Sequence, residues 1–215
     1  MTDAYGFSSL PLADIRSGTT VLVAGPTHGG ARELALRMLA GESNEGAIIV
    51  STNERSSRIV GECQRVGLDV RADSTVVLDC VGDEDQNVPA RILPLSGPSD
   101  LTGIGMRFSD VYRDFQQAGI ERVRTGLYTT STLLTFNDLQ TVSRFVHTLV
   151  GRIDSVDGFG VLLIDPSNHD ERAVSTLAQF CNARVDVRDA DEGPELRARG
   201  LANQPRDWTA FAPVE

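Results

Sequence analysis

Short apolar runs alternate with helical patterns along the chain, and this alternation restricts the fold more than any other feature of the sequence. Strands that are joined through helices lie parallel, and a parallel sheet needs helices on both faces because both faces are buried. The sequence therefore predicts an α/β fold with a mostly parallel central sheet. The expected strands are residues 19–26, 46–52, 74–81, 120–128 and 160–166, and the expected helices are residues 31–41, 54–67, 98–119, 138–153 and 170–181.

The last part of the chain has a different pattern. Three short segments with alternating polarity, "ARVDVRD", "PELRARGL" and "RDWTAFA", are separated by turn-forming residues. This spacing is typical of an antiparallel β-meander. A length of 215 residues suits one domain with a sizeable core. We therefore expect an N-terminal segment at residues 1–17, followed by a single domain at residues 18–215 that ends in the meander.

A glycine-rich turn joins the first expected strand to the first expected helix, in "LVAGPTHGGARELALRML". A phosphate-binding loop has the pattern G-x-x-x-x-G-K-[ST] in this context, and here Gly25 and Gly30 have the required separation. Backbone N–H groups and the helix dipole make such a turn an anion site. The alternative is a tight turn that binds no ligand. The candidate nucleotide-binding residues are Gly25, Pro26, Thr27, His28, Gly29, Gly30, Ala31 and Arg32.

Two side chains of the phosphate-binding pattern are missing from this turn. Ala31 stands where the lysine would contact the β and γ phosphates, and Arg32 stands where a Ser or Thr hydroxyl would hold magnesium. The chain has no lysine to replace the first. We expect His28 to be an exposed loop residue rather than a catalytic base. Arg32 either points at a phosphate or lies solvated on the helix face, and we favour the second interpretation.

Five segments, taken in their order and spacing, resemble the KaiC-like proteins of the RecA superfamily, and more closely a divergent haloarchaeal type with degenerate Walker motifs. They are "VLVAGPTHGGARELALRML", "GAIIVSTNERSSRIV", "DLTGIGMRFSDVY", "VRTGLYTTSTLLTFNDLQTVSRFVHTLVGRI" and the ending "RGL…W". The resemblance implies a RecA-like core in which the phosphate-loop strand lies beside a sensor strand. The Walker B strand would lie beyond the sensor strand, and the antiparallel C-terminal strands would extend the other flank.

The same resemblance implies where the catalytic groups would stand. The Walker B aspartate is missing, because the strand "RVRTGLY" ends in Gly126, Leu127 and Tyr128. Glu54 remains as one candidate catalytic residue after the second strand. Asp165, at the end of the sensor strand, is the other candidate. It could hold a metal or a water there, or it could cap the turn before Pro166, and we favour the cap.

These losses favour a protein that does not hydrolyse ATP and has a regulatory or scaffold role with weak or no nucleotide binding, although they leave open whether it is an enzyme. ATP is the candidate ligand, a magnesium requirement is in doubt, and no metal site is expected. The alternative is an ATPase of the same superfamily that uses Arg32, Glu54 and Asp165, or an arginine from a neighbouring subunit. A role in DNA recombination would follow from the superfamily alone.

The charge balance bears on partners and on location. Asp and Glu number 30 against 20 basic residues, all of them Arg, which gives a net charge of -10. An acidic surface without lysine favours a halophilic, archaeal cytoplasm, where salt screens self-repulsion. The alternative is a high-GC genome that favours Arg codons, but a preference for Arg does not explain the excess of acidic residues. The acidic surface disfavours direct nucleic-acid binding, which needs a basic stripe. The unpaired spacing of three cysteines and the lack of long apolar runs predict a cytoplasmic protein without disulfides or membrane spans. A protein partner or a homo-oligomer is expected.

Overall fold

The computed structural model describes residues 4–7, 9–27, 30–82 and 87–214. Within these residues the main strands are β3 (Thr19–Ala24), β4 (Gly46–Ser51), β5 (Thr75–Asp79), β6 (Arg91–Pro94), β7 (Val123–Tyr128), β8 (Phe159–Ile164), β9 (Ala183–Ala190), β10 (Gly193–Arg199) and β11 (Thr209–Ala210). They form a nine-stranded sheet in the order β11-β10-β9-β3-β8-β7-β4-β5-β6. All neighbouring strands from β9 to β6 in this order are parallel, whereas β10 is antiparallel to both β9 and β11.

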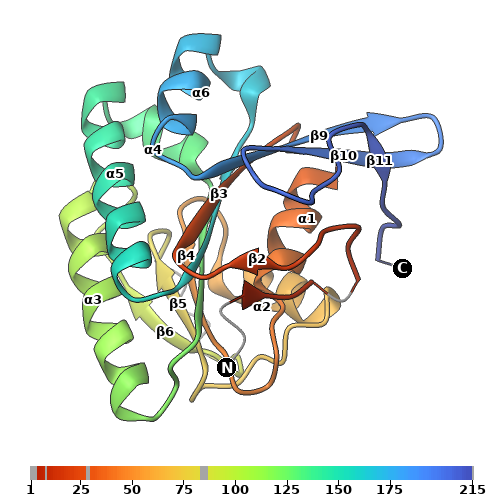
Figure 1. Ribbon diagram of the computed structural model, residues 1–215. Helices are drawn as coiled ribbons and strands as arrows, with labels where there is room; N and C mark the ends of the chain where they lie inside the picture. Colours follow the sequence, from red (N-terminus) through yellow and green to blue (C-terminus); the bar gives the residue numbers. More distant parts are fainter. Residues whose placement is uncertain (1–3, 8, 28–29, 83–86, 215) are drawn as a thin grey trace.

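Helices cover both faces of this sheet (Figure 1). They are α1 (Gly30–Leu39), α2 (Ser56–Arg65), α3 (Leu101–Gln117), α4 (Thr130–Phe136), α5 (Leu139–Ser155) and α6 (Glu171–Ala178). Helices α1 and α2 contribute to one hydrophobic cluster, and α3 to α6 contribute to the other. Strand β3 serves both clusters because successive side chains point to opposite faces, with Val21 and Val23 on one face and Leu22 and Ala24 on the other. The predicted α/β fold is confirmed.

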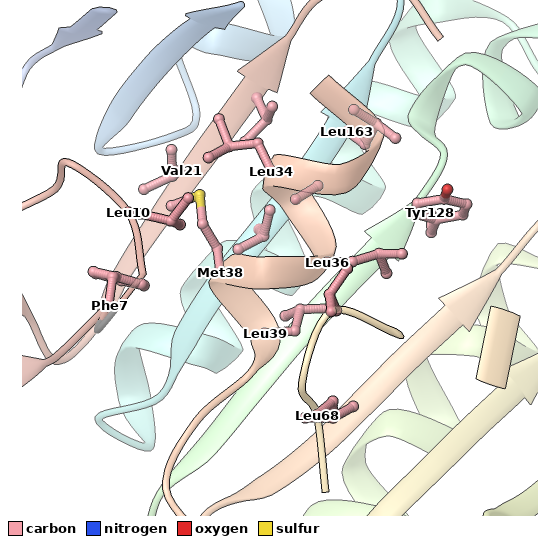
Figure 2. Packing of buried hydrophobic residues seen from close by; sticks show 14 of the residues in the cluster. Phe7, Leu10, Val21, Leu34, Leu36, Met38, Leu39, Leu68, Tyr128 and Leu163 are labelled. Atoms are coloured by element: carbon pink, nitrogen blue, oxygen red, sulfur yellow. The ribbon is translucent and has the colours of Figure 1, made fainter. Parts of the chain in front are cut away.

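Figure 2 shows how α1 packs on its face of the sheet, with Leu34 and Met38 beside Val21. Phe7 and Leu10, from the N-terminal segment, lie at the same cluster. Residues before β3 also form a small antiparallel pair, β1 (Ala4–Tyr5) with β2 (Ile15–Arg16). The N-terminal segment therefore contributes side chains to the core.

The predicted meander is confirmed as β9, β10 and β11, with the addition that β9 also pairs in parallel with β3. Sequence reasoning assigned no element to β6 or α4. Strand β6 has only four residues, and its side chains do not alternate between buried and exposed. Helix α4 has seven residues, which is too short for a clear apolar period. In the described part of the chain, no helix has the length and apolar character needed to cross a membrane.

Candidate functional site

The glycine-rich turn lies at the carboxyl end of β3, where ligands bind in open parallel sheets. The Gly25 amide donates to the Ile164 carbonyl of β8 at 3.2 Å, and α1 begins at Gly30. The strand-to-helix arrangement that the sequence predicted is therefore present. Two of the candidate nucleotide-binding residues, His28 and Gly29, lie outside the described residues.

Both described glycines of the motif lie tightly against the protein's own chain. A Cβ added at Gly25 would lie 2.8 Å from the Ala31 Cβ and 2.9 Å from the Val187 carbonyl oxygen of β9. A Cβ added at Gly30 would lie 2.5 Å from the Pro194 Cβ. Such distances leave no room for a side chain, so internal packing alone requires glycine at both positions. The G-x-x-x-x-G spacing is thus explained without a ligand.

Arg32 does not lie solvated on the helix face, so the interpretation we favoured is wrong. Its Nη1 is 2.9 Å from Glu54 Oε1, its Nη2 is 2.8 Å from Glu62 Oε2, and its Nε donates to Glu62 Oε2 at 2.9 Å. The guanidinium carbon also lies 4.8 Å from the centroid of the Tyr128 ring. The three charged side chains are only 13–16% exposed. Arg32 is withdrawn from solvent because its planar guanidinium group has five N–H donors, and the two carboxylates accept from them in place of water.

We call Arg32, Glu54, Glu62 and Tyr128 the carboxyl-end cluster. Its members come from α1, from the residues between β4 and α2, from α2, and from the end of β7. The Tyr128 hydroxyl donates to Glu62 Oε2 at 3.3 Å. Arg58 approaches both carboxylates from the exposed side, with Nε–O distances of 3.4 and 3.3 Å. Two arginines therefore balance two glutamates, and Glu54 is held by guanidinium groups.

Glu62 is the member of this cluster that sequence reasoning missed. Glu54, Arg58 and Glu62 are spaced four residues apart, which is the spacing of ion pairs along one helix face. That charge pattern could have indicated a charged face on α2. It could not have indicated that Arg32, from another helix, pairs with it.

Asp165 has all its carboxylate interactions within the protein's own turns. Oδ2 accepts hydrogen bonds from the Thr27 amide at 2.7 Å and from the Thr27 hydroxyl at 2.5 Å. Oδ1 accepts from the Ser167 amide at 3.0 Å and from the Ser167 hydroxyl at 2.5 Å. Asp165 thereby caps the short 3₁₀ helix Pro166–Asn168, as the favoured interpretation predicted.

The environment of Asp165 favours its ionised form. Burial raises the pKa of the carboxyl group, but the hydrogen bonds from Ser167 and Thr27 together outweigh burial and hold the pKa below its ordinary value. Asp165 also ties the glycine-rich turn to the end of β8 through Thr27. The arrangement stabilises the turn itself.

The resemblance to KaiC-like proteins implies that a nucleotide would bind here together with magnesium. The residues at this turn do not fit a magnesium ion. The positively charged Arg32 stands where a hydroxyl ligand would be, β7 ends in Tyr128 instead of a carboxylate, and the Asp165 oxygens are taken by Thr27 and Ser167. Among the described residues, no group of three or more His, Cys, Asp or Glu could hold a metal ion.

An open groove of about 440 Å³ adjoins the cluster. It lies where α1, α2 and the β9–β10 hairpin meet, and it is lined by Thr27, Gly30, Arg32, Glu33, Leu36, Arg58, Glu62, Arg65, Asp189, Pro194 and Pro213. Basic and acidic side chains are mixed along its walls. The groove therefore has no concentration of positive charge matched to a polyphosphate.

The strand order defines the class of protein, because β3 has β8 and then β7 on one side and the C-terminal strands on the other. This is the KaiC-like, RecA-type fold. The KaiC-like protein PH0186 from Pyrococcus horikoshii OT3 is similar at a TM-score of 0.66 and 15% identity, over 97% of this chain and 91% of that one. The uncharacterized protein PH0321 from Pyrococcus horikoshii, crystallised in complex with an unknown peptide, is similar at 0.67 and 12% identity, over 86% and 84%.

The match to a family model is more specific than the fold. The chain belongs to the family of unknown function DUF7504, whose model matches residues 18–187. This range runs from just before β3 to the middle of β9, so it includes the glycine-rich turn and the whole carboxyl-end cluster. A comparison with curated proteins found no match.

Proposed function

We propose that this protein is a KaiC-like protein that does not hydrolyse ATP, binds nucleotide weakly or not at all, and acts as a regulatory or scaffold protein. The observation that carries the proposal is the pairing of Arg32 with Glu54 and Glu62. The cation that could have met a phosphate is neutralised within the chain, and so is the candidate catalytic carboxylate.

Phosphoryl transfer depends on positioned positive charge, since the protein mainly neutralises charge on the transferring phosphoryl group and orients the nucleophile. If Arg32 turned towards a phosphate, only the exposed Arg58 would still pair with Glu54 and Glu62. These two carboxylates would then lie close to the negative charge of the phosphate. Like charges at that distance repel. The native pairing therefore opposes both nucleotide binding and catalysis.

A regulatory or scaffold protein acts by binding another protein, so we expect it to bind a protein partner or a second copy of the chain. The structural neighbour crystallised with an unknown peptide supports peptide recognition by this fold. The net charge of -10 opposes direct nucleic-acid binding. The same composition, acidic and without lysine, supports a cytoplasmic protein of a halophilic archaeon.

The test is ATP turnover by the purified protein with magnesium, at low salt and in molar potassium chloride. We expect no phosphate release above that of a heat-inactivated sample. Glu54→Gln is the matched variant, because it removes the candidate catalytic carboxylate of the carboxyl-end cluster while keeping the side-chain size. Turnover by the native protein that disappears in Glu54→Gln would overturn the proposal and establish the ATPase alternative.

A further inference from the structure

The outward face of the β9–β10 hairpin is lined by charged side chains. On each strand alternate residues face α1, including Val185, Val187 and Leu196, which belong to the core. The residues between them face the other way. The register pairs them across the two strands as Arg184 with Arg199, Asp186 with Arg197, and Arg188 with Glu195.

This hairpin face is basic in an acidic protein. Four arginines and two carboxylates leave it with a net charge of +2. Because the whole chain carries -10, the residues outside this face together carry -12. Such a separation of charge directs a negatively charged partner to this face and away from the rest of the surface.

Asp186 is the centre of the hairpin face. Its carboxylate is only 9% exposed and lies within 2.6 Å of Arg184 Nε, 3.3 Å of Arg197 Nε and 3.4 Å of Arg199 Nε. Three guanidinium groups have far more N–H donors than one carboxylate has acceptor sites. The hairpin face therefore has more guanidinium N–H donors than its own carboxylates can accept. These donors are grouped around Asp186.

Trp208 holds two of the arginines in place. The guanidinium carbons of Arg188 and Arg197 each lie 4.3 Å from the centroid of its ring. Cation–π contacts of this kind orient the planar guanidinium groups. They reduce the loss of side-chain conformational entropy when a ligand binds to these arginines. The ring is engaged by guanidinium groups, which argues against a platform for base stacking.

We propose that the hairpin face binds an acidic segment of a partner protein, through carboxylates that the arginines recognise. From Arg184 to Arg188 the face is roughly 13 Å long, at about 3.3 Å per residue, which suits a short extended peptide. A nucleic acid would run beyond the face onto a surface of net charge -12, whereas a short acidic segment would not. The groove beside Arg32 is lined by Asp189 and Pro194, which alternate with the outward residues, so the two surfaces are separate.

The experiment measures binding of a labelled short polyglutamate peptide by fluorescence anisotropy, together with the emission of Trp208, the one tryptophan of the chain. We expect binding that weakens with added salt and changes the Trp208 emission. Arg184→Glu with Arg199→Glu leaves the two arginines at Trp208 in place and should weaken binding about tenfold or more. The single exposed change Arg199→Gln should weaken it by a smaller factor, and it tests the proposal if the double variant does not fold.

The matched control is Arg113→Glu with Arg144→Glu, which makes the same charge change at exposed positions of α3 and α5. Binding should survive in this control. The proposal is overturned if the peptide does not bind, or if the control loses as much affinity as the hairpin variants, which would indicate net charge alone. Tighter binding of a short single-stranded oligonucleotide of matched charge would also overturn it, in favour of a nucleic-acid surface.

Discussion

Two clusters of arginine, glutamate and tyrosine lie at opposite ends of the central sheet, and they differ in what holds the arginine. In the amino-end cluster, formed by Arg122, Arg124, Glu45 and Tyr5, Arg124 and Glu45 are 1% and 3% exposed. Arg124 bonds Glu45 through Nε at 2.5 Å and donates to the carbonyls of Met38 and Gly6. In the carboxyl-end cluster, Arg32 meets carboxylates and an aromatic ring beside an open groove.

The comparison shows that arginine, glutamate and tyrosine can have different roles in the two clusters. At the amino end, main-chain carbonyls from the N-terminal segment and α1 fix a single arrangement of Arg124. At the carboxyl end, the hydrogen-bond partners of Arg32 within the described residues are all side chains, which can move. The first cluster therefore stabilises the fold, and the second lies beside the glycine-rich turn at the carboxyl end of β3.

The largest effect is expected from Arg124→Leu. Removing this guanidinium leaves the Met38 and Gly6 carbonyls without their donor and weakens the neutralisation of buried Glu45. We expect a loss of about 3–5 kcal/mol in the free energy of unfolding, measured by urea denaturation. Arg122→Leu, at the more exposed arginine of the same cluster, is the control and should cost less. A loss below about 1 kcal/mol for Arg124→Leu would show that the two clusters do not differ as described.

A smaller effect is expected from Arg32→Met. The change leaves two partly buried carboxylates without their main cation, at a cost of about 2 kcal/mol in unfolding free energy. In a double-mutant cycle with Glu62→Gln, the two changes should be less costly together than their sum. Strict additivity would indicate that Arg32 and Glu62 do not interact in solution.

The third prediction concerns pH. The pKa of Asp165 is lowered in the folded protein, so its contribution to stability is present above the ordinary pKa of about 4 and is lost as the pH falls through the folded value. Asp165→Asn should remove about 1 kcal/mol at neutral pH and little at strongly acidic pH. Unfolding free energies across the acid range measure this. Asp110→Asn, at an exposed carboxylate of α3, is the control for losing one negative charge. An equal loss at all pH values in Asp165→Asn would contradict the assignment.

The smallest effect is expected at Cys63, which lies on α2 next to Glu62. Burial, and then the nearby Glu62 charge, raises the pKa of this thiol to about 12, so alkylation near neutral pH should be slow. If Arg32 holds α2 in place, Arg32→Met should increase the alkylation rate of Cys63 a few-fold, measured by peptide mass spectrometry. Cys181, whose pKa burial also raises to about 12, is an internal control that should not change. Equal rates at Cys63 in both proteins would remove the argument that Arg32 restrains α2.

Local sequence patterns predicted the fold well because its helices and strands depend mainly on residues that are close together in the sequence. The expected helix at residues 31–41 is α1, Gly30–Leu39, and the expected strand at residues 160–166 is β8, Phe159–Ile164. The candidate site was harder, because its contacts join distant parts of the sequence. Arg32 meets Glu62 from another helix, and Gly30 lies against Pro194 of β10 and against Phe211, which directly follows β11. No periodicity in a single sequence reports such pairs.

The most direct measurement of the central claim is a calorimetric titration of the native protein with ATP, with and without Mg²⁺, at low salt and in molar potassium chloride. In the carboxyl-end cluster both glutamates are already paired with Arg32, so we expect that Mg²⁺ does not strengthen ATP binding. Binding that tightens about tenfold or more when Mg²⁺ is added would contradict the account, because each factor of ten requires about 1.4 kcal/mol of metal-dependent contact.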